Sequence, residues 1–180
     1  MPLQGIEHFS LDGVTYEAFN TSGGLGTLAD SLEGKVRELD YKTVRYPGHA
    51  ERMQLLINDL KLGERRALLK DVLETAIPVT LQDVVLVFVT VTGMRGGRLT
   101  QESYASKIYP REVNGRMWSA IQRTTAAGIA AMVDLMRGGQ LKRRGFLRQE
   151  EVSLEEFLAN RFGSIYAAEA VNLAIGARPA

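Results

Sequence analysis

Hydrophobic and polar residues alternate along two stretches near the N-terminus, Ile6 to Leu11 and Val14 to Asn20. The pair Asp12-Gly13 separates them, which is the two-residue signal of a β-hairpin. A short helix is predicted over about Thr27 to Leu32, and a further strand from Lys35 to Tyr46. The first part of the chain is therefore predicted to combine an antiparallel hairpin with a third strand.

Apolar residues then recur at helical spacing in two consecutive segments. The first begins at His49 and stops at Gly63, and the second ends before Pro78, because the residue before a proline disfavours helix. We expect these two helices to pack as a pair. The inward face of the second is predicted to carry Leu68, Leu69, Val72, Leu73 and Ala76.

The second half of the chain opens on Asp83 to Thr92, a β-branched run that is apolar on both faces. Such a run is typical of a central strand covered on both sides, with Leu99 to Tyr109 as its partner. The longest helix is predicted over Trp118 to Met136, and Ser153 with Glu156 forms a capping box for another. The stripe predicted to face the core on the longest helix contains Trp118, Ile121, Thr125, Ile129, Met132 and Met136. Together the elements predict an α+β fold, a mixed β-sheet covered by helices, in one domain over residues 1–180.

Composition excludes several classes of function. Lys and Arg number 22 against 21 Asp and Glu, so nothing favours a nucleic acid or an anionic membrane as partner. Cysteine is absent, and the two histidines, His8 and His49, lie far apart, so no metal site is expected. The longest apolar run, Val84 to Val89, is too short to span a bilayer, and no signal peptide is evident. We expect a cytoplasmic protein.

Gly24 to Ala29 fits the pattern G-x-G-x-x-A, which cradles a pyrophosphate when it follows a strand and opens a helix. The context argues against that role. The preceding strand is half polar, the following helix is short, and the next strand has no acid at its end for a ribose hydroxyl. We therefore expect no cofactor-binding residues here.

The segment Tyr41 to His49, YKTVRYPGH, places an arginine where a strand gives way to a turn and a helix. Pro47 cannot continue a ladder, so Arg45 lies near a strand end. The helix start led by Gly48 has free N–H groups that favour anions. A guanidinium beside such a helix start predicts a receptor for a carboxylate or a phosphate. The alternative is that Arg45 pairs with a nearby Asp or Glu.

Four blocks of the chain resemble the C-terminal domain of saccharopine dehydrogenases: YKTVRYPGH, Tyr16 to Val36, Trp118 to Leu135, and Gly145 to Gly163. The resemblance implies a substrate-binding and dimerisation domain of an NAD(P)-dependent oxidoreductase that acts on the CH–NH group of an amino acid in lysine metabolism. It also implies that NAD or NADP is bound by a Rossmann domain absent from this chain, so that the isolated chain is inactive. The expected partners are a small amino-acid substrate with carboxylates and a second copy of the chain.

The resemblance also assigns site residues. Thr43, Val44 and Arg45 match the family's substrate-binding motif. A second arginine of that family falls near residues 20–23, where this chain has hydroxyls on Thr21 and Ser22 instead. Hydroxyls hold a carboxylate less strongly than a guanidinium does. Lysine, with fewer carboxylates, therefore fits the substrate site as well as saccharopine does.

Two further residues near this motif have alternative readings. Tyr46 either lines the substrate pocket or fills space, and His49 either acts as a catalytic acid or base or only caps the helix start. The alternative for the whole chain is a stand-alone binding or assembly module without catalysis. No residue is predicted to bind the cofactor or a metal.

Overall fold

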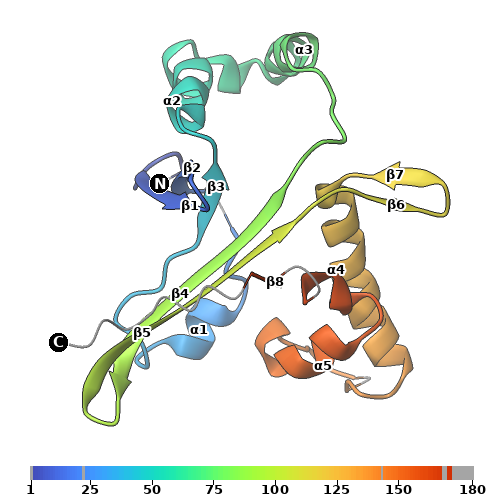
Figure 1. Ribbon diagram of the computed structural model, residues 1–180. Helices are drawn as coiled ribbons and strands as arrows, with labels where there is room; N and C mark the ends of the chain where they lie inside the picture. The colour runs from blue at the N-terminus through green and yellow to red at the C-terminus, as the bar shows by residue number, and fades with distance from the viewer. Residues whose placement is uncertain (1, 22, 143, 168–169, 172–180) are drawn as a thin grey trace. The chain divides into compact units, whose positions relative to one another are not determined.

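Helices and strands occur in both halves of the chain in the computed structural model (Figure 1), which describes residues 2–21, 23–142, 144–167 and 170–171. The predicted α+β class is confirmed. The chain divides into two compact units, Met1–Val79 and Thr80–Ala180, and each is described by itself. The single mixed sheet was wrong, because the described strands form three separate sheets and all their pairings are antiparallel.

The first unit contains the sheet β1-β2-β3, formed by Glu7–Leu11, Val14–Asn20 and Lys42–Arg45. The predicted hairpin is confirmed, with Leu11 paired to Val14 across the turn. Asp12 and Gly13 both have positive φ, at 52° and 77°. A two-residue turn with this conformation has the twist that joins two antiparallel strands.

Strand β2 is the buried centre of this unit. Four consecutive residues, Tyr16 to Phe19, are buried although they alternate between the two faces of the sheet. On one face the Tyr16 ring stacks between the rings of Phe9 and Tyr46. On the other face the Phe19 ring stacks on His49. Both faces of β2 are therefore covered from within the unit.

The third strand is shorter than predicted. Residues 35–41 are not part of β3, which begins at Lys42. Lys42 pairs with Asn20, the last residue of β2, so the residues before it have no strand opposite them. The helical segments of this unit are α1 Leu28–Leu32, α2 His49–Gln54, a π-helical turn η1 Leu55–Asp59, a 3-10 turn η2 Leu62–Glu64 and α3 Arg66–Ala76.

Helix α3 has the predicted extent but not the predicted burial. None of its residues is buried, and Leu68 and Val72 are both exposed. The inward face expected from the apolar spacing therefore has no cover deep enough to bury it. Periodicity shows which residues share a face, but it does not show whether another element packs on that face.

The second unit contains a long hairpin, β4 Val85–Arg95 and β5 Arg98–Ile108, closed by Gly96 and Gly97 (Figure 1). Strand β5 was predicted correctly, but the buried central position expected for β4 was wrong. Its partner among the described residues is β5, and from Phe88 onward its residues are exposed; Val91 is 63% exposed. Strand β8, Ala170–Val171, pairs with β5, and Arg111–Val113 with Arg116–Trp118 form the small hairpin β6-β7.

Helix α4, Ala120–Arg137, is the long helix that the sequence predicts. A capping box between Ser119 and Gln122 opens it. The Asp83 carboxylate adds two hydrogen bonds, accepting from the backbone N–H groups of Ala120 at 2.6 Å and Ile121 at 2.9 Å. The first four backbone N–H groups of an α-helix have no partner within the helix, so the side chains of Ser119 and Asp83 define where α4 begins.

The core-facing stripe predicted for α4 was wrong. Large apolar residues of that stripe are exposed, with Ile129 at 67%. The small residues face inward because they let the 3-10 turn η4, Gly163–Tyr166, approach: the Tyr166 hydroxyl donates to the Thr124 carbonyl at 2.8 Å. The buried residues of α4 are Ala120, Thr124, Ala127, Ala131 and Leu135.

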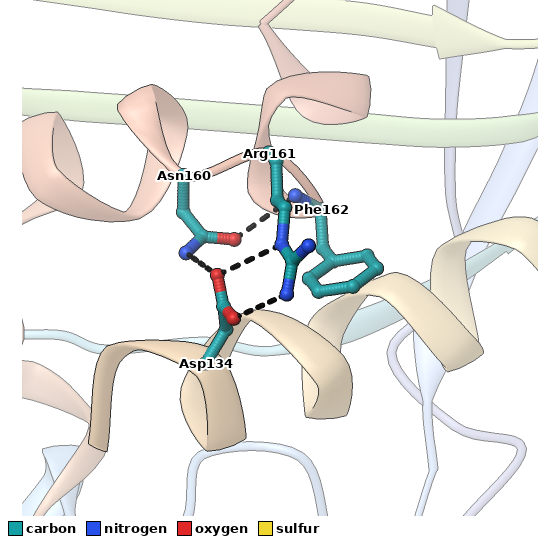
Figure 2. A network of polar contacts seen from close by, with 4 residues as sticks. All are labelled: Asp134, Asn160, Arg161 and Phe162. Carbon is teal, nitrogen blue, oxygen red and sulfur yellow. Dashed lines mark hydrogen bonds and ion pairs between the residues drawn. The ribbon is translucent and has the colours of Figure 1, made fainter. Parts of the chain in front are cut away.

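Asp134 on α4 joins this helix to the segment that follows helix α5, Leu154–Ala159 (Figure 2). Its carboxylate accepts two bonds from the Arg161 guanidinium, at 2.6 and 3.1 Å, and one from the Asn160 side chain at 3.0 Å. The Arg161 hydrogen bonds, with those of Asn160, hold the pKa of Asp134 below its usual value.

The described helices contain none that is long and apolar enough to cross a membrane.

Candidate functional site

The predicted site residues all belong to the first unit, at the ends of β2 and β3. Thr43, Val44 and Arg45 lie on β3, and Thr21 follows the last residue of β2; Ser22 lies outside the described residues. Because the two strands are antiparallel neighbours, the hydroxyl oxygens of Thr21 and Thr43 come within 3.4 Å. Two segments separated in the sequence thus meet at one place.

The predicted site residues lie on both faces of the sheet. Thr43 and Arg45 share one face, where they lie opposite Phe19 and Glu17 in the β2 register. Val44 lies on the other face. Tyr46 stacks there on Tyr16, with the ring centroids 5.7 Å apart, and remains exposed. The face that carries Thr21, Thr43 and Arg45 is therefore the candidate site, whereas the side chains of Val44 and Tyr46 contribute to the opposite face.

Glu17 is the residue of this site that the sequence analysis missed. Its side chain is only 3% exposed, and its two carboxylate oxygens accept hydrogen bonds from the backbone N–H groups of Gly48 and Ala50, both at 2.6 Å. The expectation that the helix start offers free N–H groups to a ligand was therefore wrong, because Glu17 already binds them. A single charged residue inside the otherwise neutral strand VTYEAFN was the available signal.

Opposing effects determine the pKa of Glu17. Burial raises it, but hydrogen bonds from the backbone N–H groups of Ala50, Gly48 and His49 lower it further, and the result is a pKa below the usual value. Glu17 is consequently ionised at neutral pH. A buried carboxylate that accepts charge-assisted bonds from a helix start fixes that helix on the sheet.

Arg45 is exposed on the candidate face. Its Nη1 donates to the carbonyl oxygen of Val44 at 2.8 Å, and among the described residues its guanidinium forms no ion pair. Glu17 lies opposite in the register but gives its oxygens to the turn amides. The guanidinium therefore retains donors for a ligand.

His49, the first residue of α2, stacks on Phe19 with ring centroids 6.0 Å apart. Partial burial and the charge of Arg45 lower the pKa of His49, while the Glu17 carboxylate opposes them and Arg52 acts in the same direction as Arg45. The imidazole is therefore mainly neutral at pH 7 and able to accept a proton. His8 Nε2 lies 4.0 Å from a Glu17 oxygen, so both histidines of the chain lie near this carboxylate.

A hollow of about 330 Å³ lies beside the Thr21 end of this face. The walls combine polar groups, such as Thr21 and Asp40, with the apolar side chains of two leucines. Its lining residues are Pro2, Asn20, Thr21, Gly23, Leu25, Leu39, Asp40 and Tyr41.

The glycine pattern beside the hollow serves packing. Gly24 has φ +105°, and the ring of Tyr41 occupies the space in which a side chain would lie. Strands β2 and β3 are antiparallel neighbours, whereas a dinucleotide fingerprint joins parallel strands through a long crossover helix. Helix α1 has five residues. Gly24 to Ala29 therefore lacks the βαβ geometry that holds a pyrophosphate.

No protein-family model matches the chain, and no solved structure matches it. Within the described ranges, no three His, Asp or Glu side chains come together in a group that could hold a metal ion. The site is thus defined by its own geometry: an exposed guanidinium, paired hydroxyls and a neutral imidazole on one face of a sheet, beside a hollow with both polar and apolar walls.

Replacement of Glu17 by Gln should destabilise the first unit at neutral pH by about 2 to 4 kcal/mol, because two charge-assisted bonds are lost and an amide group meets backbone donors. The folded-state pKa of Glu17 is depressed, so its stabilisation is present above the unfolded value, roughly 4.3, and is lost as the pH falls through the lower folded value. Urea unfolding at pH 7 and at pH 3 to 5 measures both effects. Glu7→Gln, which removes an exposed ion pair with Lys42, is the control and should cost less than about 1 kcal/mol. Equal losses in the two variants would contradict the structural role of Glu17.

Replacement of Gly24 by Ala should destabilise the first unit by about 2 to 5 kcal/mol, since a positive φ costs about 1 to 2 kcal/mol and the crowding against Tyr41 costs about 1 to 3 kcal/mol. Gly23→Ala is the matched control, because Gly23 has φ +82° but nothing within 4 Å of the added carbon. The Gly23→Ala variant should lose only the stability that the positive φ costs, about 1 to 2 kcal/mol. In a Tyr41→Ala background the two alanine variants should become equally stable, as a double-mutant cycle by urea unfolding would measure. A difference that persists without the Tyr41 ring would rule out the packing role.

Proposed function

We propose that this chain is the substrate-binding and dimerisation domain of a saccharopine dehydrogenase-like, NAD(P)-dependent oxidoreductase of the cytoplasm. One observation carries the proposal. The two segments that the resemblance assigns to the substrate meet at the Thr21 and Thr43 hydroxyls, and Arg45 shares their face with its guanidinium free of ion pairs among the described residues.

Saccharopine is a lysine joined through its side-chain nitrogen to glutamate, so it carries three carboxylates and a secondary amine. The hydride acceptor in its oxidation is the nicotinamide of NAD or NADP, which the proposal assigns to a separate Rossmann domain. The residues described here bind and orient the substrate. Arg45 holds one carboxylate through its planar fork, and the Thr21 and Thr43 hydroxyls bind a second polar group. The neutral His49 imidazole is the candidate acceptor for the proton of the amine.

Lysine is the alternative substrate, because it presents a single carboxylate to this face. A second guanidinium within reach of the ligand would favour saccharopine, whose additional carboxylates require additional partners. The comparison of saccharopine with lysine as ligands therefore decides between the two.

A stand-alone assembly module without catalysis is the alternative from another class of function. The exposed apolar residues of β4 and β5 favour association, but they do not distinguish an assembly module from a dimeric enzyme. Ligand binding at Arg45 would exclude a module that only assembles, whereas a stand-alone binding module differs from the enzyme in catalysis.

Replacement of Arg45 by Ala should weaken the binding of saccharopine to the chain about thirtyfold or more, since a charge-assisted bond contributes about 2 kcal/mol or more and 1.4 kcal/mol is tenfold. Arg45→Lys should recover only part, because a point charge cannot reproduce a bidentate fork. Isothermal titration calorimetry measures both. The free energy of unfolding should change by less than about 0.5 kcal/mol, because the side chain is exposed without an ion pair. Arg66→Ala, on the exposed first residue of α3, is the control. If Arg45→Ala lowers the stability and leaves the affinity for saccharopine unchanged, Arg45 is not part of the substrate site.

We further propose that the chain forms a homodimer through the β4-β5 hairpin. Exposed apolar side chains occur on both of its faces, with Val89, Val91 and Tyr104 on one and Phe88, Met94 and Leu99 on the other. In the part of the chain that the structure describes, strand β8 pairs only with Ala105 and Ser106, so the rest of the hairpin is a two-stranded ribbon, which is only marginally stable alone. The outer edge of β4 has no strand beside it among the described residues. A second copy related by a two-fold axis would cover both features.

Sedimentation at several concentrations should give about twice the 19.9 kDa chain mass. Val91→Glu should shift the protein to monomers, because a carboxylate at the interface loses its hydration. Val79→Glu, which adds the same charge at a position that is 97% exposed, should leave the dimer unchanged. Circular dichroism checks that both variants keep their fold. A wild-type protein that stays monomeric at high micromolar concentration would exclude the dimer.

A further inference from the structure

A second guanidinium lies at the turn that Glu17 holds. Arg52, on α2, has its side chain folded back over Gly48, four residues earlier, and its guanidinium occupies the space in which a side chain of Gly48 would lie. Gly48 has φ +88°, a conformation that residues other than glycine rarely adopt. The backbone N–H of Arg52 donates to the Gly48 carbonyl at 3.3 Å, which begins the helical turn beneath this side chain.

Arg52 belongs to the last turn of α2, but its guanidinium lies over Gly48 at the start of the helix. The N-terminal end of a helix carries partial positive charge, so a cation is disfavoured there. Arg52 is exposed, and in the part of the chain that the structure describes it makes no ion pair. Glu51, the acid of the first turn, forms no ion pair with it either. The nearest buried carboxylate, Glu17, already uses both oxygens for Gly48 and Ala50.

Arg45 adds a second guanidinium near this turn that forms no ion pair among the described residues. It lies opposite Glu17 in the strand register, and Glu17 binds the amide of Gly48, over which Arg52 lies. The charges of Arg45 and Arg52 both lower the pKa of His49, so both guanidinium groups lie within electrostatic range of this imidazole. The Glu17 carboxylate already binds the turn amides, so two guanidinium groups without ion pairs among the described residues leave donors for an anionic ligand.

We propose that Arg45 and Arg52 together bind two carboxylates of one small ligand, with Arg52 as a specificity-determining residue for dicarboxylates over monocarboxylates. This inference rests on the proposed function for the position of the site. It deepens that function, because it selects the carboxylate-rich amino acid, saccharopine, over lysine. Each guanidinium offers a planar fork of donors that matches one carboxylate. Glu17 keeps the two forks in place by fixing the turn between β3 and α2.

The test uses the complete 180-residue chain and three probes: saccharopine, glutarate as a simple dicarboxylate, and lysine. Replacement of Arg52 by Ala should weaken the binding of saccharopine and of glutarate about tenfold or more. The binding of lysine should weaken less than about twofold, because only the ligands with more than one carboxylate lose a charge-assisted bond. Arg52→Lys should retain part of the affinity. Arg66→Ala, an exposed arginine at the start of α3, controls for general charge and should leave all three affinities unchanged. Calorimetry at two salt concentrations measures the set.

An NMR titration of the imidazole of His49 gives a second readout that stability changes would not produce. Arg52→Ala should raise the pKa of His49 in the free protein, because a neighbouring positive charge is removed. Glutarate should raise the pKa of His49 in the wild-type protein, because the bound anion compensates both arginines. An unchanged pKa in both experiments would show that Arg52 is not near the site.

The outcomes separate the inference from the proposed function. If Arg45→Ala abolishes saccharopine binding and Arg52→Ala does not change it, the inference is wrong and the proposed function stands. If glutarate binding depends on both arginines but saccharopine binds no more tightly than glutarate, the dicarboxylate site stands and the proposed substrate is wrong. If Arg66→Ala weakens binding as much as Arg52→Ala does, the inference is overturned. It is also overturned if no probe binds at 10 mM, a concentration that corresponds to a binding free energy of less than about 3 kcal/mol.

Discussion

The first unit depends on one buried interaction, the carboxylate of Glu17 bound to the backbone N–H groups of Gly48 and Ala50. It joins the central strand to the first turn of α2, and so it determines where the chain goes after β3. An ionised group is tolerated there only because oriented donors replace the water that it loses. Everything proposed for the site follows from this fixed turn: the exposed position of Arg45, the stacking of His49 on Phe19, and the position of Arg52 over Gly48.

The same construction occurs twice around the candidate face. At Gly24 the ring of Tyr41 fills the space of a missing side chain, and at Gly48 the guanidinium of Arg52 does so. Both glycines have positive φ, so each position combines a backbone conformation that other residues rarely adopt with a close approach by another residue's side chain. The glycine-rich pattern near the hollow thus has a packing explanation. A nucleotide fingerprint and a packing contact use glycine for the same steric reason, and only the strand topology distinguishes them.

Local signals in the sequence were sufficient where the structure is determined by neighbours along the chain. The Asp12-Gly13 hairpin and the capping box between Ser119 and Gln122 both involve residues within a few positions of one another. Burial could not be predicted in the same way. The β-branched run of β4 was expected in a covered sheet, yet most of it is exposed, because an apolar pattern does not state which surface covers it. Glu17 was missed for the related reason that its partners lie 31 and 33 residues away.

The second unit reverses the usual arrangement of an amphipathic helix. Helix α4 turns Ala127 and Ala131 inward, where η4 and its Tyr166 hydroxyl approach the backbone, and leaves Ile129 and Val133 exposed. A helix that packs only within its own unit is expected to turn its largest apolar side chains inward, because the buried apolar area increases with side-chain size. The described part of this unit therefore stabilises itself through close backbone approach and polar contacts such as Asp134 with Arg161. Large apolar side chains of α4, and those on both faces of β4 and β5, stay exposed. This exposed apolar surface is the reason why the proposed dimer interface is placed in this unit and not in the first.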